Sequence, residues 1–203
     1  GAYIIDTVEK IISEDGDRFL NMAYQEAVAE LGKVGLGKMV DLINIDLENI
    51  GVKFDVWFKE RDLYDNGEYD HVIEILRQAG LLIEKEGALW FASTSLGEDK
   101  DNVIIRSNGT PTYFASDIAY HHNKFIKRGF PTVINIVGAD HQGHVGRLKA
   151  MVAALGVDPD RLTIILAQMV SLKRGNEAVR VSKRTGELVT LRELVDEVGV
   201  DAC

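Results

Sequence analysis

The chain has 203 residues, of which 46% are hydrophobic, so it is long enough to bury a core in one or two domains. Its formal net charge is −9 and its pI is near 5.1, which excludes a general basic surface for nucleic acid and leaves only local contacts of that kind. A single cysteine, Cys203, excludes a disulfide framework, and no apolar run reaches membrane-spanning length, so we expect a soluble cytoplasmic protein with no membrane partner.

Residues 1 to about 50 carry apolar side chains at helical spacing, first around Ile4 to Ile12 and again around Met39 to Leu47. The stretch 31–37 between them contains three glycines. It lacks a preceding strand and the glycine spacing of a phosphate-binding loop. We therefore expect a connection between two helices at 31–37.

The next part of the chain predicts a small mixed region of strands and a helix. Apolar and polar residues alternate over Val52–Phe58, which predicts a half-buried strand. Further along, the patterns predict a helix over 69–78, a β-hairpin over 81–91 and a strand over 103–106. We place a domain boundary near Asn108, because strand-helix alternation begins there, so the predicted domains are 1–108 and 109–203.

Residues Tyr113–Lys127 predict an amphipathic helix that ends at Gly129. Tyr113 and Asp117 lie one turn apart on one face, where a hydroxyl and a carboxylate could hold a ligand ammonium or guanidinium. The alternative is a solvated helix face on which Asp117 forms an ordinary surface ion pair.

A strand-helix-strand unit follows, with strands expected over 132–137 and 162–170 and a helix over 145–156. Both strands read as fully buried parallel strands. The turn 138–144 leaves the carboxyl end of the first strand, where ligands bind in open α/β sheets. It contains Gly138, Asp140, His141, Gln142 and His144. The alternative is a tight turn in which Asp140 caps the following helix.

The last part of the chain predicts a short hairpin, a basic loop over 180–186 and a final helix over 191–197. Thr190 and Glu193 have the spacing of a capping box at the start of that helix.

Several segments together resemble a known family. Arg180-Val181-Ser182-Lys183-Arg184 resembles the KMSKS loop of class I aminoacyl-tRNA synthetases, with Arg180 in place of the first lysine and Arg184 in place of the last serine. Its order along the chain resembles the arginyl-tRNA synthetases, and the segments that carry this likeness are 54–58, 87–91, 113–121, 138–144, 180–184 and 190–194.

The resemblance implies a fold and an activity. The fold would be α/β: 109–203 would form the second half of a Rossmann-like nucleotide-binding catalytic domain with parallel strands, preceded by a mixed α/β connective insertion over 1–108. The activity would be ATP-dependent activation of L-arginine to arginyl-adenylate and transfer of arginine to tRNA(Arg). ATP would act as a substrate with Mg²⁺, no tightly bound metal is expected, and the protein would be a monomer.

The resemblance also implies roles for individual residues. The substrate guanidinium would be held by Tyr113 and Asp117, with Gln142 or His141 completing the pocket. The nucleotide would contact Gly138, Asp140, His144, Val181 and Lys183. In the loop, Lys183 would stabilise charge on the transferring phosphates, with Ser182 and Arg184 in support. Arg180 keeps the charge of the usual lysine but not its compact ammonium, so its role stays open.

One departure from the family concerns completeness. The HIGH-type signature of these enzymes has no counterpart before Gly1, so half of the expected ATP site is absent, and we expect the isolated fragment to be inactive. Its exposed sheet edges would favour self-association.

Two other functions remain open on the residues alone. A zinc-dependent hydrolase could use His121, His141 and His144, although no pair of histidines has the His-x-x-x-His spacing on one helix. A non-catalytic nucleotide- or tRNA-binding module could use the basic residues of 173–184.

Overall fold

The computed structural model describes residues 2–168, 170–175, 177–178 and 189–203. The chain forms two compact units, which are described separately. The helical unit comprises Gly1–Trp57 and Ser171–Cys203, and the α/β unit comprises Phe58–Val170.

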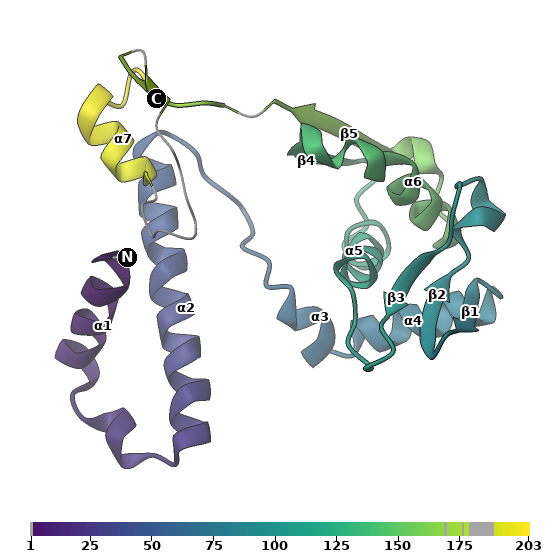
Figure 1. Cartoon of the computed structure of the whole chain (residues 1–203), viewed down its shortest axis with the longest axis horizontal. Helices are drawn as coiled ribbons and strands as arrows, with labels where there is room; N and C mark the ends of the chain where they lie inside the picture. Colours follow the sequence, from purple (N-terminus) through teal and green to yellow (C-terminus); the bar gives the residue numbers. More distant parts are fainter. Residues whose placement is uncertain (1, 169, 176, 179–188) are drawn as a thin grey trace. The chain divides into compact units, whose positions relative to one another are not determined.

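The helical unit is built on a pair of antiparallel helices, α1 (Ala2–Asp15) and α2 (Tyr24–Asn49), shown in Figure 1. The Thr7 hydroxyl contacts the Met39 sulfur at 3.5 Å, and Lys38 forms an ion pair with Glu14 across the pair. The unit also contains the 3-10 turn η1 (Arg18–Asn21), the short strands β6 (Lys173–Arg174) and β7 (Glu177–Ala178), and helix α7 (Leu191–Val198).

Helix α7 begins with the predicted capping box. The Thr190 hydroxyl accepts the Glu193 backbone N–H at 3.1 Å, and the Glu193 carboxylate accepts the Thr190 backbone N–H at 2.7 Å. Arg192 donates to Asp46 of α2 at 2.7 Å, which joins α7 to α2 within this unit.

The connection predicted at 31–37 was wrong, because α2 runs without a break from Tyr24 to Asn49. A glycine inside a helix costs only about 1 kcal/mol relative to alanine, and the surrounding leucines, lysines and glutamates favour the helix. The true connection is 16–23, where Gly16 adopts a positive φ of 56° that suits glycine.

The strand predicted over Val52–Phe58 was also wrong. The segment is extended but forms no ladder with any strand among the described residues, and Phe54 and Val56 are more than half exposed. An alternating pattern forms a stable strand only where a neighbouring strand satisfies its backbone groups. This segment joins the two units instead.

The α/β unit contains all of the main buried cluster, which includes Leu63, Leu76, Phe91, Ile118, Met151 and Leu162. Helix α5 (Tyr113–His122) lies at its centre and contacts helices α3 (Arg61–Asp65), α4 (Glu68–Gln78) and α6 (Val145–Ala154), as well as strand β3 (Asn102–Ile105). It continues into a π-helical turn, η3 (Asn123–Lys127), in place of the single helix expected to residue 127.

Two sheets flank α5. Strands β1 (Leu82–Lys85), β2 (Ala88–Phe91) and β3 form an antiparallel sheet in that order, and the β1–β2 hairpin turns at Glu86 and Gly87, which both have positive φ. The polar loop before β3 contains the 3-10 turn η2 (Ser93–Leu96). Strands β4 (Val133–Gly138) and β5 (Leu162–Ala167) pair in parallel, so the predicted strand-helix-strand unit is confirmed.

The parallel strands are not buried on both faces. Val133 and Leu162 are buried, whereas Ile134 and Ile136 are 58% and 70% exposed. The prediction of fully buried strands was therefore wrong for this chain, because the described helices cover one face of the pair only. The overall fold class, a mixed α/β protein with parallel strands, is confirmed.

Candidate functional site

Helix α5 presents the predicted cation-binding face. Its first turn is capped by Thr112, whose hydroxyl accepts the Ala115 N–H at 3.4 Å and donates to the Val103 carbonyl of β3 at 2.9 Å. The cap fixes the start of α5. Tyr113, the first residue of the helix, is 82% exposed, and Asp117, one turn later, is half-buried.

A pocket of about 380 Å³ opens beside this first turn. Its lining residues are Glu60, Tyr64, Arg106, Pro111, Thr112, Tyr113 and Ser116. Tyr64 and Ser116 share a hydrogen bond of 2.6 Å between their hydroxyls. The pocket therefore offers hydroxyl groups together with one carboxylate, that of Glu60, and one guanidinium, that of Arg106.

Asp117 has an unusual electrostatic environment. Burial raises the pKa of its carboxyl, while the positive charges of Arg147 and Lys124 lower it, and His141 also acts to lower it. Asp117 forms no ion pair with any residue that the structure describes, so the predicted alternative of an ordinary surface ion pair does not occur. Among the described residues, the carboxylate is thus under the influence of positive groups and has no ion-pair partner.

Glu60 was missed by the sequence analysis. It lines the pocket, and its charge acts to raise the pKa of Asp117. Two carboxylates on neighbouring elements reinforce attraction for a cation. The only sequence signal was its position at the start of α3, where acidic residues are common for a different reason.

Arg147 of α6 was missed as well. Its guanidinium lies 4.6 Å from the centre of the Phe114 ring and donates to the Asn102 side chain at 3.3 Å. Burial lowers its pKa, and the charges of Asp117 and Glu98 oppose that shift. Arg147 therefore supplies a positive charge that acts on Asp117 from α6, the helix between β4 and β5.

The turn after β4 is the 3-10 segment η4 (Ala139–His144). A Cβ added at Gly138 would meet an oxygen of the exposed Asp140 carboxylate, which would have to turn aside. Asp140 and His141 are exposed, with carboxylate and imidazole 3.9 Å apart, and the His141 and His144 rings meet edge to face at 5.3 Å. Asp140 does not cap α6, because His144 occupies that position.

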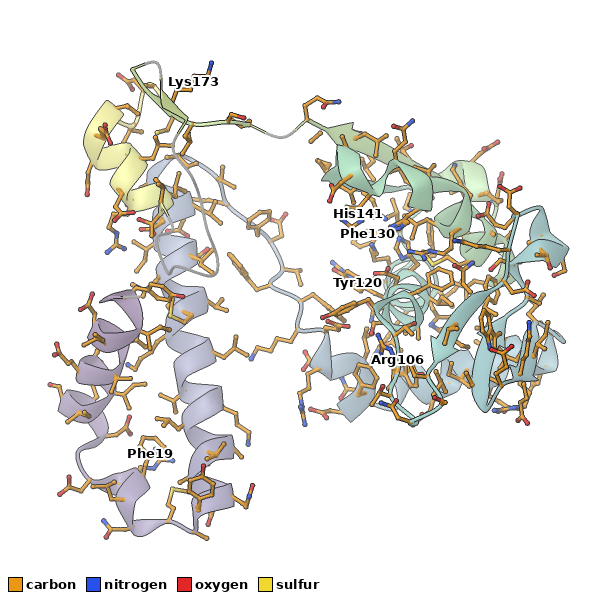
Figure 2. The ribbon with its side chains drawn as sticks, in the orientation of Figure 1. Phe19, Arg106, Tyr120, Phe130, His141 and Lys173 are labelled. Carbon is orange, nitrogen blue, oxygen red and sulfur yellow. The ribbon has the colours of Figure 1, made fainter. Side chains whose placement is uncertain are left out.

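The structure brings some of the predicted site residues together. Tyr113, Asp117, Gly138, Asp140, His141, Gln142 and His144 all belong to the α/β unit. His141 is among the groups that act to lower the pKa of Asp117. His141 and Tyr120, which lies on α5, are labelled in Figure 2. Gln142 is exposed.

The loop residues Val181, Ser182, Lys183 and Arg184, and with them Arg180, lie outside the described residues. Their predicted roles therefore stay predictions.

The histidines do not form a zinc site in the part of the chain that the structure describes, where no group of three or more His, Cys, Asp or Glu side chains could hold a metal ion. Both ring nitrogens of His121 are engaged, by the Asp117 carbonyl at 2.7 Å and by the Asn135 side chain at 2.8 Å. The zinc hydrolase alternative has no support from this geometry. Within the same described residues, no helix is long and apolar enough to cross a membrane.

Comparison with known proteins gives a consistent result. A family model described as tRNA synthetases class I (R), catalytic domain, matches residues 7–202. The arginine-tRNA ligases of Dehalococcoides mccartyi strain CBDB1 and Carboxydothermus hydrogenoformans are each 55% identical to this chain, over 203 and 202 residues. These matches cover 100% of this chain and 36% of each relative, so the chain spans about a third of their length.

Solved structures agree with the sequence relatives. A Campylobacter jejuni structure described as an arginyl-tRNA synthetase superimposes with a TM-score of 0.85 at 38% identity and covers 100% of this chain and 43% of that one. The Thermus thermophilus arginyl-tRNA synthetase gives a TM-score of 0.68 at 19% identity, covering 92% of this chain and 38% of that one. The second likeness shows the fold alone.

Proposed function

This chain belongs to the family of class I tRNA synthetase (R) catalytic domains, and on that premise we propose that it is part of an arginine-tRNA ligase. The ligase activates L-arginine with ATP to form arginyl-adenylate and transfers the arginine to tRNA(Arg). The arginine carboxylate attacks the α-phosphorus of ATP, and the bond to pyrophosphate breaks. ATP is used as its Mg²⁺ complex, and the working protein is a cytoplasmic monomer.

The observation that carries this proposal is the half-buried Asp117 carboxylate, which has no ion-pair partner among the described residues and lies on the same helix face as the exposed Tyr113 hydroxyl. A planar guanidinium can donate two parallel N–H bonds, one to each oxygen of a carboxylate, which a compact ammonium cannot do in the same geometry. Tyr113 and Asp117 hold the guanidinium, and His141 or Gln142 completes the pocket from the turn after β4.

The nucleotide binds at the carboxyl end of β4. Gly138 allows its backbone to approach the adenosine, while Asp140 and His144 present polar atoms to the ribose. Val181 and Lys183 also contact the nucleotide, with Ser182 and Arg184 in support, and the Lys183 ammonium offsets the negative charge that develops as pyrophosphate leaves.

The first test is Asp117→Asn in a full-length ligase that carries this segment. The amide keeps the shape of the side chain but removes its charge, so we expect the KM for arginine to rise by about 10- to 100-fold, as for the loss of one hydrogen bond to a charged group. The KM for ATP should change less than 3-fold by comparison. Both are measured by arginine-dependent pyrophosphate exchange.

Asp160→Asn is the matched control, because the Asp160 side chain is 98% exposed and belongs to the same unit. It should leave both KM values unchanged. An equal rise in the KM for arginine and for ATP in Asp117→Asn would contradict the assignment of Asp117 to the guanidinium.

A further inference from the structure

Three side chains connect helix α5 to strand β4 in an unbroken series of hydrogen bonds. Lys124 Nζ donates to Asn135 Oδ1 at 3.2 Å, and Asn135 Nδ2 donates to His121 Nε2 at 2.8 Å. His121 Nδ1 then donates to the backbone carbonyl of Asp117 at 2.7 Å. We name this series the α5–β4 bridge. It ends on the residue that carries the proposed guanidinium-binding carboxylate.

The protonation state of His121 fits the bridge. The residue is 3% exposed, and burial together with the nearby Lys124 lowers its pKa to about 4, so the ring is neutral near pH 7. A neutral imidazole has one N–H and one acceptor nitrogen. Since Nδ1 donates to Asp117, Nε2 can accept from Asn135, and the donor and acceptor ends of the Asn135 amide are both used.

Lys124 anchors the other end of the bridge. Its ammonium lies 4.3 Å from the centre of the Tyr120 ring, and Tyr120 in turn stacks on Phe58 at 4.3 Å between ring centres. Burial lowers the pKa of Lys124 to about 8, and the charge of Asp117 opposes that shift. The Lys124 end of the bridge is therefore packed against an aromatic ring, and its hydrogen bonds are partly buried.

The two elements joined by the bridge are those that carry the proposed arginine and nucleotide contacts. Asp117 lies on α5, whereas Asn135 lies in β4, three residues before Gly138 and the turn with Asp140 and His141. Strand β4 is held along its length by β5. A side chain that fastens α5 to β4 therefore sets the distance between the Asp117 carboxylate and the turn after the strand.

We propose that Asn135 is a positioning residue for arginine: through His121 and Lys124 it holds the Asp117 end of α5 at a fixed distance from the turn after β4. This inference rests on the proposed function. Asn135 touches neither substrate and acts through α5. A shift of about 1 Å in a substrate-holding group is enough to reduce the rate strongly.

The test uses a full-length ligase with this segment and measures arginine and ATP separately in pyrophosphate exchange. Asn135→Ala should raise the KM for arginine about 10-fold and leave the KM for ATP within 3-fold.

Three further variants test whether the bridge acts as one unit. His121→Phe removes the same link and should change the two KM values by the same factors as Asn135→Ala. His121→Gln keeps a side-chain oxygen toward Asn135 and should restore most of the arginine affinity. The double variant Asn135→Ala/His121→Phe should be no worse than either single variant, because both break one bridge.

A purely structural effect is separated by Val152→Ala. Val152 is fully buried in α6, a helix that carries none of the three bridge residues, so this variant should lower the melting temperature without a specific change in the KM for arginine. The proposal is overturned if Asn135→Ala behaves like Val152→Ala, or if Asn135→Ala raises both KM values equally. If Asp117→Asn itself leaves the KM for arginine unchanged, the proposed function fails instead, whatever Asn135→Ala does.

Discussion

At the scale of single residues, the site depends on charges that the fold places together. Burial of Asp117 raises the pKa of its carboxyl and the charge of Glu60 acts in the same direction, whereas Arg147, Lys124 and His141 act to lower it. Burial alone would favour a neutral acid, which binds a guanidinium weakly. The neighbouring cations oppose that effect and so favour the charged form of the carboxylate.

The buried His121 predicts a dependence of stability on pH. Its folded-state pKa of about 4 lies below the ordinary value of 6.5, so below pH 6.5 the unfolded chain binds a proton that the folded chain does not. The free energy of unfolding should therefore be highest above pH 6.5 and fall as the pH drops toward 4. The loss due to His121 should be about 2–3 kcal/mol by pH 4.5.

Urea unfolding of the wild type and of His121→Gln between pH 7.5 and 4.5 measures this contribution. His122 also has a lowered pKa, caused by burial and by the nearby His71, and it contributes equally to both proteins. The difference between their pH profiles therefore isolates His121. Parallel profiles for the two proteins would mean that His121 titrates normally in the folded state.

At the scale of elements, helix α2 shows how local signals are outweighed. It contains Gly32, Gly35 and Gly37 yet runs for 26 residues, because the flanking residues favour a helix and α1 packs beside it. By contrast, Val52–Phe58 has the alternation of a strand and forms none, since no described strand pairs with it. Pairing and packing partners decided both cases.

Gly35→Ala should stabilise the chain by about 0.5–1 kcal/mol, because alanine lowers the entropy of the unfolded state and favours the helix. An added Cβ at Gly35 meets no atom within 4 Å, so no clash opposes the gain. Gly16→Ala is the matched control: its φ of 56° disfavours any side chain, and the variant should be destabilised. The melting temperatures of Gly35→Ala and Gly16→Ala are measured by thermal unfolding followed by circular dichroism. A loss of stability in Gly35→Ala would mean that α2 is bent or locally unwound at Gly35.

At the scale of the whole molecule, the chain matches only part of the length of its relatives. It spans about a third of the length of its arginine-tRNA ligase relatives, which are 36% covered. In keeping with that, Ile134, Ile136 and Ile165 expose an apolar face of the β4–β5 pair. Soluble proteins rarely leave such a face open. The division into domains at residue 108 stays a prediction.

The isolated 203-residue chain should therefore give no arginine-dependent pyrophosphate exchange above that of its own Lys183→Ala variant, with cognate tRNA present. The family resemblance assigns part of the ATP contacts to residues other than these 203. The phosphates would therefore lack half of the protein groups that stabilise their negative charge. A full-length ligase carrying the same segment serves as the positive control. Turnover in the isolated chain that Lys183→Ala abolishes would contradict the expectation.

The sequence by itself determined the family, the parallel β4–β5 unit and the capped helix α7, because motif order, apolar runs and the Thr190–Glu193 spacing are local and readable along the chain. Only the tertiary structure decided that Glu60 and Arg147 act on Asp117, and that Asn135 ties α5 to β4. Those relations join side chains from elements far apart in sequence, and their charges and hydrogen bonds acquire an effect only when folding brings them together and removes water between them.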